Sequence, residues 1–309
     1  MSTGLPANLI NDQNVVMDKY GLLTLATSNY EVTIAPQVGG SLRSLDWRGL
    51  PVFRKARTGH ILDAACFPIV PFCNRIALGR FAADGVEHRL PSNFPDTWHP
   101  HALHGYGWVR PWQVMALDGA SIRLVHDYDE GVWPWRYRAE QQVTVAADGV
   151  RIRMSVTNLS SSPMPAGLGF HPYFPGDDSA VYHGLHRGEW ETSPDGLPQS
   201  LVDAGRAVDW WQGAPMTSRV VDTIQEGRKG KLTIQRPADG LLIEMEPSDG
   251  LPCTGVYVGR DADFFCVEPL SHPTDAINRA PEKMAMLAEG ETLKASLLIR
   301  ASRIRTQDD

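Results

Sequence analysis

The feature that most constrains this chain is a two-residue alternation of apolar and polar side chains. It is clearest in GVRIRMSVTN, residues 149–158, where every second side chain is aliphatic and those between are polar or charged. Residues 137–145 (YRAEQQVTV) alternate in the same way, and Asp148-Gly149 between the two runs suits a tight turn. Because successive side chains of a strand point to opposite faces, the pattern predicts an antiparallel hairpin with one buried and one solvated face.

The alternation recurs throughout the chain, which favours a sheet of many strands over a mixed fold. Further alternating runs lie at residues 30–36, 231–236, 241–247 and 293–301. Helical patterns are scarce, apart from one or two turns predicted within residues 280–290. The 28 glycines and 23 prolines suit many short strands joined by turns. The sequence therefore predicts an all-β fold, a large antiparallel β-sandwich with little helix.

Nothing in the chain marks a boundary between domains. There is no Gly/Ser linker, no low-complexity tract and no shift in composition, so residues 1–309 are expected to form a single β-sandwich domain. Residues 183–218 are irregular and rich in Gly, Trp and Pro, and we expect long loops there rather than a linker.

Charge and composition narrow the classes of partner. The net charge is −7 and no basic run is present, which argues against binding to nucleic acid or to an anionic membrane. The start of the chain lacks the features of a signal peptide, and no apolar run reaches the ~20 residues that span a bilayer. We therefore expect a soluble, cytoplasmic protein. The one basic cluster, Arg54, Lys55 and Arg57, fits a solvated loop, with contact to a phosphate-bearing substrate as the alternative.

The cysteines give no sign of a disulfide framework or a zinc site. Cys66, Cys73, Cys253 and Cys266 each lie among apolar residues, and no pair has CxxC spacing. We expect four buried free thiols.

The densest titratable chemistry lies in HPHALHG, residues 99–105. His99, His101 and His104 could form a metal site, because neutral imidazole is a common ligand for zinc, copper or iron. The carboxylate that such a site would need is missing a few residues on, where Gly105 and Tyr106 stand. His99 and His101 fit polar loop histidines, whereas the apolar setting of His104 favours an imidazole aimed at a ligand.

Three further stretches place polar groups among apolar neighbours. Asn74 and Arg75 lie in FPIVPFCNRIALGRF, His171 in GLGFHPYFPG, and Glu268 after the apolar run FFCV. Arginine suits the binding of hydroxyls or a carboxylate, histidine exchanges protons near neutral pH, and burial raises the pKa of a carboxyl group. Structural roles remain as alternatives: an arginine ion pair, a core histidine bonded to backbone, and a buried ion pair of the glutamate. Together the residues are typical of an active site assembled at the ends of strands.

In order along the chain, these motifs resemble the aldose 1-epimerase (mutarotase) family. The resemblance begins at VTIAPQVGGSLRSLDWRG, continues through NRIALGRF and HALHG, and takes in HPYF and VEPLSHPTDAINR. It runs nearly end to end, and the ordered set is more specific than any one motif. It implies a large antiparallel β-sandwich that uses no metal and no organic cofactor. It also implies a small-molecule partner, a free aldose whose α and β anomers are interconverted.

The resemblance also implies roles for individual residues. Glu268 resembles the general base that takes the proton of the C1 hydroxyl, and His171 resembles the general acid that protonates the ring oxygen. His104 and Arg75 resemble residues that bind the sugar and stabilise charge at the ring oxygen, with Asn74 beside them. A buried glutamate with a raised pKa and a histidine near its ordinary pKa would suit this chemistry.

The family also has an aspartate that holds sugar hydroxyls. Asp222 is the candidate, with Asp203 and Asp209 as alternatives. The chain departs from the family's usual pattern after the first histidine, in GYGWVRPW, and after HPYF, in PGDDSAVYHGL. We expect these differences to bear on specificity, which leaves the sugar open among hexoses, pentoses, deoxy sugars and phosphorylated sugars.

Two other functions compete with mutarotation. A glycoside hydrolase would need two carboxylates flanking the bond, and Glu268 has no obvious carboxylate partner. A non-catalytic sugar-binding or sensor protein on the same fold is the stronger alternative, because fold does not fix function. It would not need both His171 and Glu268. We expect a monomer or a homodimer.

Overall fold

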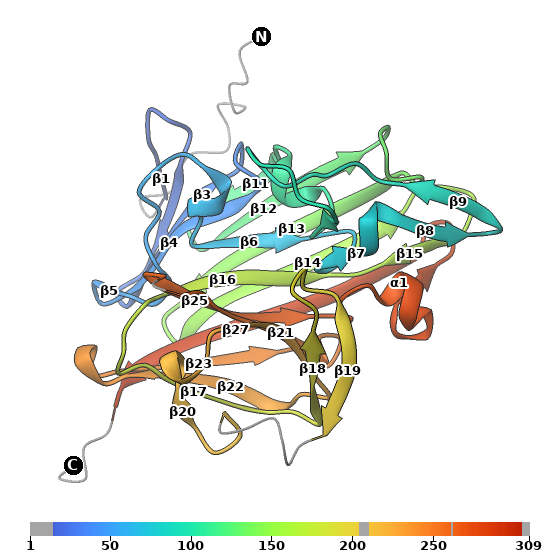
Figure 1. Cartoon of the computed structure of the whole chain (residues 1–309). Coiled ribbons are helices and arrows are strands. Elements are labelled where there is room, and N and C mark those ends of the chain that lie inside the picture. The colour runs from blue at the N-terminus through green and yellow to red at the C-terminus, as the bar shows by residue number, and fades with distance from the viewer. Residues whose placement is uncertain (1–14, 204–209, 261, 305–309) are drawn as a thin grey trace.

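The computed structural model describes residues 15–203, 210–260 and 262–304. Strands dominate these residues, and most belong to two large antiparallel sheets (Figure 1). The predicted β-sandwich with little helix is confirmed.

The first sheet has 12 strands among the described residues. Its order is β1 (Val15–Met17), β2 (Leu23–Ala26), β3 (Tyr30–Ala35), β4 (Ser41–Trp47), β6 (Cys66–Ile69), β16 (Gly169–Pro175), β25 (Phe264–Leu270), β24 (Cys253–Val258), β21 (Val221–Glu226), β18 (Gly188–Thr192) and β19 (Pro198–Asp203), with β5 (Leu50–Pro51) beside β4. The strand β16 thus lies between β6 and β25, although these three segments are far apart in the sequence.

The second sheet has nine strands among the described residues. Its order is β11 (Gln113–Asp118), β12 (Ser121–Tyr128), β13 (Tyr137–Ala146), β14 (Gly149–Asn158), β27 (Thr292–Arg303), β23 (Leu241–Pro247), β22 (Lys229–Arg236), β17 (Val181–Leu185) and β20 (Ala214–Pro215). The predicted hairpin is β13–β14, paired without a break from Tyr137 opposite Asn158 to Ala146 opposite Gly149.

Short elements complete the described chain. Three two-stranded sheets pair β7 (Arg75–Ile76) with β10 (Ala102–Leu103), β8 (Arg80–Ala83) with β9 (Val86–Arg89), and β15 (Met164–Ala166) with β26 (Ala285–Leu287). The helical elements are α1 (Ala276–Arg279) and single 3₁₀ turns at Ile61–Asp63, Ala77–Gly79, Gly107–Val109, Met216–Ser218, Pro237–Asp239 and Pro281–Lys283. Among the described residues, no helix has the length and apolar character needed to cross a membrane.

One of two irregular segments differs from expectation. Residues 183–218 contain β18 and β19 and not only loops, because β18 pairs with β19 on one side and with β21 on the other. Strand formation there depends on these distant partners, which the local sequence does not reveal. Residues 280–290 form one 3₁₀ turn followed by β26, in line with the one or two turns predicted there.

Each sheet sends one face into a shared core. Along β14 the alternating Val150, Ile152, Met154 and Val156 are buried between the sheets, as the two-residue period predicts. The central strands of the first sheet are buried on both faces. Loops cover the outer face of these strands, where a second, smaller apolar cluster forms around Phe67. All four cysteines are buried free thiols, as expected.

One contact between loops on the outer face leaves no room for a side chain. Gly105, after β10, forms a bridge with Val70 and has a left-handed φ of 70°. A Cβ atom at Gly105 would lie 2.0 Å from the carbonyl oxygen of Val70, which cannot move without shifting the chain. This glycine therefore permits the close approach of the segment that carries His104.

We expect Gly105→Ala to destabilise the protein by several kcal/mol. The matched control is Gly85→Ala, which has a similar φ of 75° but no atom within 4 Å of the added Cβ. The control should lose only about 1–2 kcal/mol from the left-handed conformation. The free energy of unfolding in urea measures both, and equal losses would show that the contact with Val70 is unimportant.

Candidate functional site

A cavity of about 360 Å³ lies on the outer face of the first sheet. Its floor comes from β16, β25, β24 and β21, and its walls come from the loops that carry Asn74 and His104. The lining residues are Leu62, Asn74, Arg75, Phe94, His99, Leu103, His104, His171, Tyr173, Asp222, Tyr257, Phe264, Cys266 and Glu268. All six residues predicted for the site, Asn74, Arg75, His104, His171, Asp222 and Glu268, lie in this one cavity.

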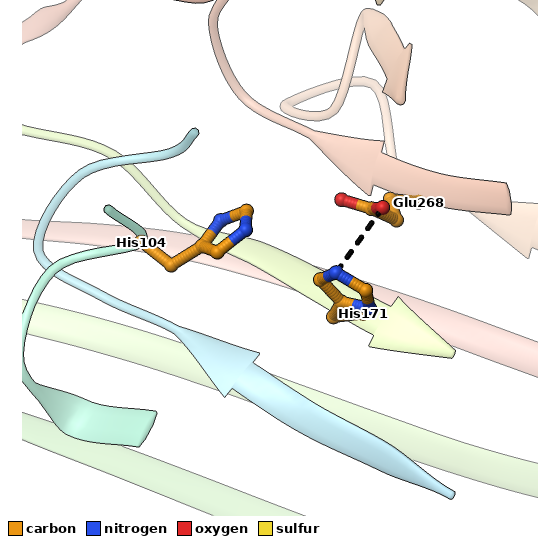
Figure 2. A group of neighbouring side chains, drawn as sticks. All are labelled: His104, His171 and Glu268. Carbon is orange, nitrogen blue, oxygen red and sulfur yellow. Dashed lines mark ion pairs between the residues drawn. The ribbon is translucent and has the colours of Figure 1, made fainter. Parts of the chain in front are cut away.

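Glu268 and His171 form a buried pair at the cavity floor. They stand on the adjacent strands β25 and β16, and Glu268 Oε1 lies 3.2 Å from His171 Nε2 (Figure 2). The other carboxyl oxygen, Oε2, is buried without a hydrogen-bond partner. The sequence predicted a site at the ends of strands, but both residues lie within their strands. The pair can therefore offer an unpaired oxygen to a ligand.

Burial moves the pKa values of the two groups in opposite directions. It raises the pKa of Glu268 to about 8, with a further increase from the negative charge of Asp222 and an opposing effect of Arg75. It lowers the pKa of His171 to about 3. The expectation of a raised glutamate pKa is confirmed, whereas that of a histidine near its ordinary pKa is wrong. The sequence does not show that the folded chain buries about nine-tenths of this side chain.

His104 faces the pair from the opposite wall, with its ring directed toward it (Figure 2). The backbone N–H of Asn74 donates to His104 Nδ1 at 3.2 Å, and the N–H of His104 donates to the carbonyl of Asn74 at 2.9 Å. Burial holds the pKa of His104 well below its ordinary value, so the ring is neutral. Because Nδ1 accepts a hydrogen bond, the single ring proton is on Nε2. His104 is therefore a fixed hydrogen-bond donor in the cavity wall.

Arg75 is held in place from three sides. Its guanidinium donates to Asn74 Oδ1 at 3.0 Å and to Asp222 Oδ2 at 2.7 Å. Gly196 lies against it so closely that a Cβ there would stand 2.6 Å from the guanidinium carbon. Its Nε is buried without a partner. The side chain is thus oriented before any ligand binds.

The alternatives to Asp222 differ in their placement. Asp222 lies in the cavity, bonded to Arg75. Asp203 is the last residue of β19, while Asp209 lies outside the described residues.

Several wall residues were not predicted. Tyr173 and Phe264 share strand faces with His171 and Glu268, so the two-residue period indicates them once those two residues are chosen. Phe94, His99 and Tyr257 carry no comparable signal, because loop folding and strand pairing bring them there. His101 is fully buried and is not a polar loop residue: its Nδ1 accepts a hydrogen bond from the N–H of Leu78 at 3.0 Å.

The two departures from the family pattern lie outside the cavity wall. Residues 105–112 and 175–185 are described, and none of them lines the cavity. Trp108 and Trp112 are fully buried beneath the loops instead. The side chains that line the cavity come from other segments, and the bearing of these two stretches on specificity stays a prediction.

The side chains of the basic cluster make contacts within the protein. Arg54 lies 3.8 Å from the ring centroid of Tyr173 and donates to backbone carbonyls, Lys55 pairs with Asp46, and Arg57 pairs with Asp263. Of the three, only Arg54 is half-buried, and it supports the cavity wall by packing on Tyr173. The solvated-loop interpretation fits Lys55 and Arg57, both of which are exposed.

His104, His171 and Glu268 form the kind of group that could hold a metal ion, with ligand atoms within 4.8 Å of one another. The tautomer of His104 opposes this. A metal-binding imidazole donates its second N–H to an acceptor, but Nδ1 of His104 meets an N–H donor. A metal at Nε2 would move the ring proton to Nδ1, where it would point at the N–H of Asn74. The donor set therefore fits a hydroxyl-bearing ligand better than an ion.

The sequence profile of the aldose 1-epimerase family matches residues 21–300. The chain belongs to this family. The uncharacterised protein YphB of Escherichia coli (strain K12) is 33% identical over 291 residues, covering 90% of this chain and 98% of YphB. These matches agree with the resemblance inferred from the motifs.

Solved structures agree with this placement. A crystal structure from Escherichia coli K12, named as a candidate aldose 1-epimerase, is 31% identical with a TM-score of 0.85, covering 91% of this chain and 99% of that one. A galactose mutarotase-like protein from Clostridium acetobutylicum, 17% identical, shares the fold with a TM-score of 0.82 over 93% of this chain and 97% of its own.

We expect Glu268→Gln to make this epimerase-family protein more stable at alkaline pH. The folded-state pKa of about 8 lies above the ordinary 4.5, so an unfolded chain ionises Glu268 first as the pH rises. Wild-type stability should fall by up to about 1.4 kcal/mol per pH unit between these values and then level off. Glutamine does not ionise and avoids this loss.

Urea unfolding at pH 5, 7 and 9 tests the effect. The advantage of Glu268→Gln should be small at pH 5 and several kcal/mol at pH 9. Glu289→Gln, at an exposed carboxyl group outside the cavity, is the control and should show no such trend. A variant no more stable than wild type at pH 9 would mean that the Glu268 carboxylate is well solvated.

Proposed function

We propose that the protein is an aldose 1-epimerase, which interconverts the α and β anomers of a free aldose by opening and reclosing the sugar ring. The single observation that carries the proposal is the buried pair of Glu268 and His171, 3.2 Å apart in a cavity of about 360 Å³. Anomerisation moves protons at the C1 hydroxyl and the ring oxygen. Both oxygens are bonded to the same carbon, so an acid and a base must stand as close together as these two groups do.

In this proposal the pair carries one transferable proton throughout the cycle. When that proton is on His171, Glu268 is a carboxylate and takes the proton of the C1 hydroxyl. His171 then gives its proton to the ring oxygen as the C1–O bond breaks, leaving an open aldehyde with Glu268 protonated and His171 neutral. Rotation about the C1–C2 bond and the reverse transfers close the ring on the other face. Each half of the cycle moves one proton onto the sugar and one proton off it, so the step balances.

The opposed pKa shifts favour the ring-opening half of this cycle. Burial favours the neutral form of both groups, which is the state they reach when the ring opens. The charged form is restored as the ring closes. Near neutral pH the pair thus keeps its one proton and needs none from solvent.

The remaining groups would orient the sugar. The Nε2–H of His104 is a donor on the wall facing the pair, and Arg75 adds a fixed cation. Such preorganised donors can stabilise negative charge at a sugar oxygen. The exposed side of Asp222 is free to accept from sugar hydroxyls while its other contacts hold Arg75. Asn74 supports both His104 and Arg75.

The direct test is polarimetry on freshly dissolved α-D-galactose, α-D-glucose and a set of pentoses. We expect faster relaxation to the same final rotation for at least one sugar, and no effect of pretreating the protein with EDTA. Loss of activity on chelation would return the histidines to a metal site. Sugar binding without any acceleration would favour the non-catalytic alternative.

Two substitutions separate catalysis from binding. Glu268→Gln and His171→Gln should each lower kcat/KM by at least about 10²-fold, because each removes a proton-transfer group. Sugar affinity, measured by calorimetry, should stay within about tenfold, or 1.4 kcal/mol. Glu289→Gln controls for the preparation. If either cavity variant keeps wild-type turnover, the assignment of acid and base is wrong.

The proposed cycle also fixes the pH dependence. The pair keeps its one proton between the pKa of His171, about 3, and that of Glu268, about 8. We expect kcat/KM to be flat from about pH 5 to 7 and to fall by about tenfold per unit above pH 8. The uncatalysed rate is subtracted at each pH. A rate that instead increases through pH 8 would mean that ionised Glu268 with neutral His171 is the active form.

A further inference from the structure

His272 lies outside the cavity, yet it joins the three chain segments that carry Glu268, His171 and Arg75. It follows Glu268 by four residues and is buried, with 2% of its surface exposed. Its Nε2 accepts a hydrogen bond from the N–H of Cys73 at 3.0 Å, just before Asn74 and Arg75. Its Nδ1 lies 2.8 Å from the carbonyl of Pro273 and must donate to it. The ring is therefore neutral, with a single tautomer and both nitrogens bonded.

The third segment meets the same ring. Gly167, four residues before His171, packs against His272 so closely that a Cβ would stand 2.3 Å from Nε2. Next to it, the N–H of Leu168 donates to Ser271 Oγ at 2.9 Å. Cys73 Sγ lies 3.1 Å from the carbonyl of Leu168. Segments 71–75, 167–171 and 268–272 thus converge on one imidazole.

The chain after His272 continues along the segment that carries Arg75. The N–H of Asp275 donates to the carbonyl of Arg75 at 2.8 Å, and Asp275 Oδ1 accepts from the N–H of Ala77 at 3.0 Å. Asn278 Nδ2 donates to the carbonyl of Arg80 at 2.9 Å. Residues 73–80 are therefore bonded at four points to the stretch that runs on from Glu268.

From this geometry we infer that His272 is a positioning residue, which sets the placement of Arg75 and Asn74 relative to the Glu268–His171 pair. The inference rests on the proposed function only for its effect on turnover. Without the bond to Cys73, the segment of Arg75 loses the first of its four bonds to the stretch after β25, the one just before Asn74 and Arg75, and its start can shift. Displacements of about 1 Å at such a site can cost up to about 10²-fold in rate.

The variants follow from the atom that makes the bond. His272→Leu keeps the bulk but removes both bonds, whereas His272→Gln can place an acceptor near the former Nε2. The control for losing a buried histidine is His186→Leu. His186 is also buried and bonded through both nitrogens, to Thr254 Oγ1 and the carbonyl of Gly184, but it is not part of the cavity.

Two measurements test the inference. The first is kcat/KM, which should fall about 10- to 100-fold in His272→Leu, recover largely in His272→Gln and stay within about twofold in His186→Leu. The second needs no turnover: the pKa of Glu268, followed by carbon NMR of its carboxyl group and assigned by its loss in Glu268→Gln. Arg75 lowers this pKa, and Asp222 and burial raise it. If Arg75 moves away, the pKa of Glu268 should increase in His272→Leu and stay unchanged in His272→Gln and His186→Leu.

The outcomes are separable. Should His272→Leu fail to fold, Asp275→Ala, which removes the bond to Ala77, replaces it and should shift the Glu268 pKa in the same direction. A folded His272→Leu with wild-type pKa and kcat/KM overturns the positioning role. If wild-type protein accelerates no sugar, mutarotation fails as the function, and the NMR measurement still decides whether His272 positions Arg75.

Discussion

The alternation of side chains along β16 and β25 is the constraint on which both stability and site depend. Phe170 and Phe174 on one strand, and Phe265 and Val267 on the next, fill the core between the sheets. The intervening side chains must then point outward, which places His171 and Glu268 on the same outer face. A slip of one residue in either strand would exchange core and site together. The packing of the sandwich thus enforces the register of the proposed chemistry.

The loops decide what that outer face can do. An exposed outer face would leave Glu268 and His171 solvated, with pKa values near those of free side chains. Phe67 on the neighbouring strand β6 and the loops carrying His104 and Trp108 cover it and exclude water, which moves the two pKa values apart. These loops are held by specific constraints: the bare Cα of Gly105, the reciprocal bonds of Asn74 and His104, and the bonds from the segment after β25. A buried, unpaired carboxyl oxygen reduces stability, and such a cost is typical of functional sites.

The three histidines of HPHALHG illustrate how one short motif can serve several purposes. His104 presents a donor to the cavity, His99 lines the wall, and His101 is buried beneath and accepts a backbone hydrogen bond. Their close spacing suggests a joint metal site, but the backbone turns each ring to different partners. The protonation state of His104 follows from a single backbone N–H, which no sequence pattern reveals.

The sequence by itself determined the alternating strands and six of the side chains that line the cavity. The two-residue period identified β13, β14 and their partner faces, because alternation is a local property of a half-buried strand. The family resemblance then selected the six cavity residues. The sequence did not identify the strands β18 and β19 or the wall residues Phe94 and Tyr257. Edge pairing and loop folding depend on partners far away in the chain. Only the tertiary structure decided the pKa of His171, the tautomer of His104 and the bonds of His272. Each of these depends on which atoms surround a side chain in three dimensions, and burial and hydrogen-bond direction are properties of the folded chain.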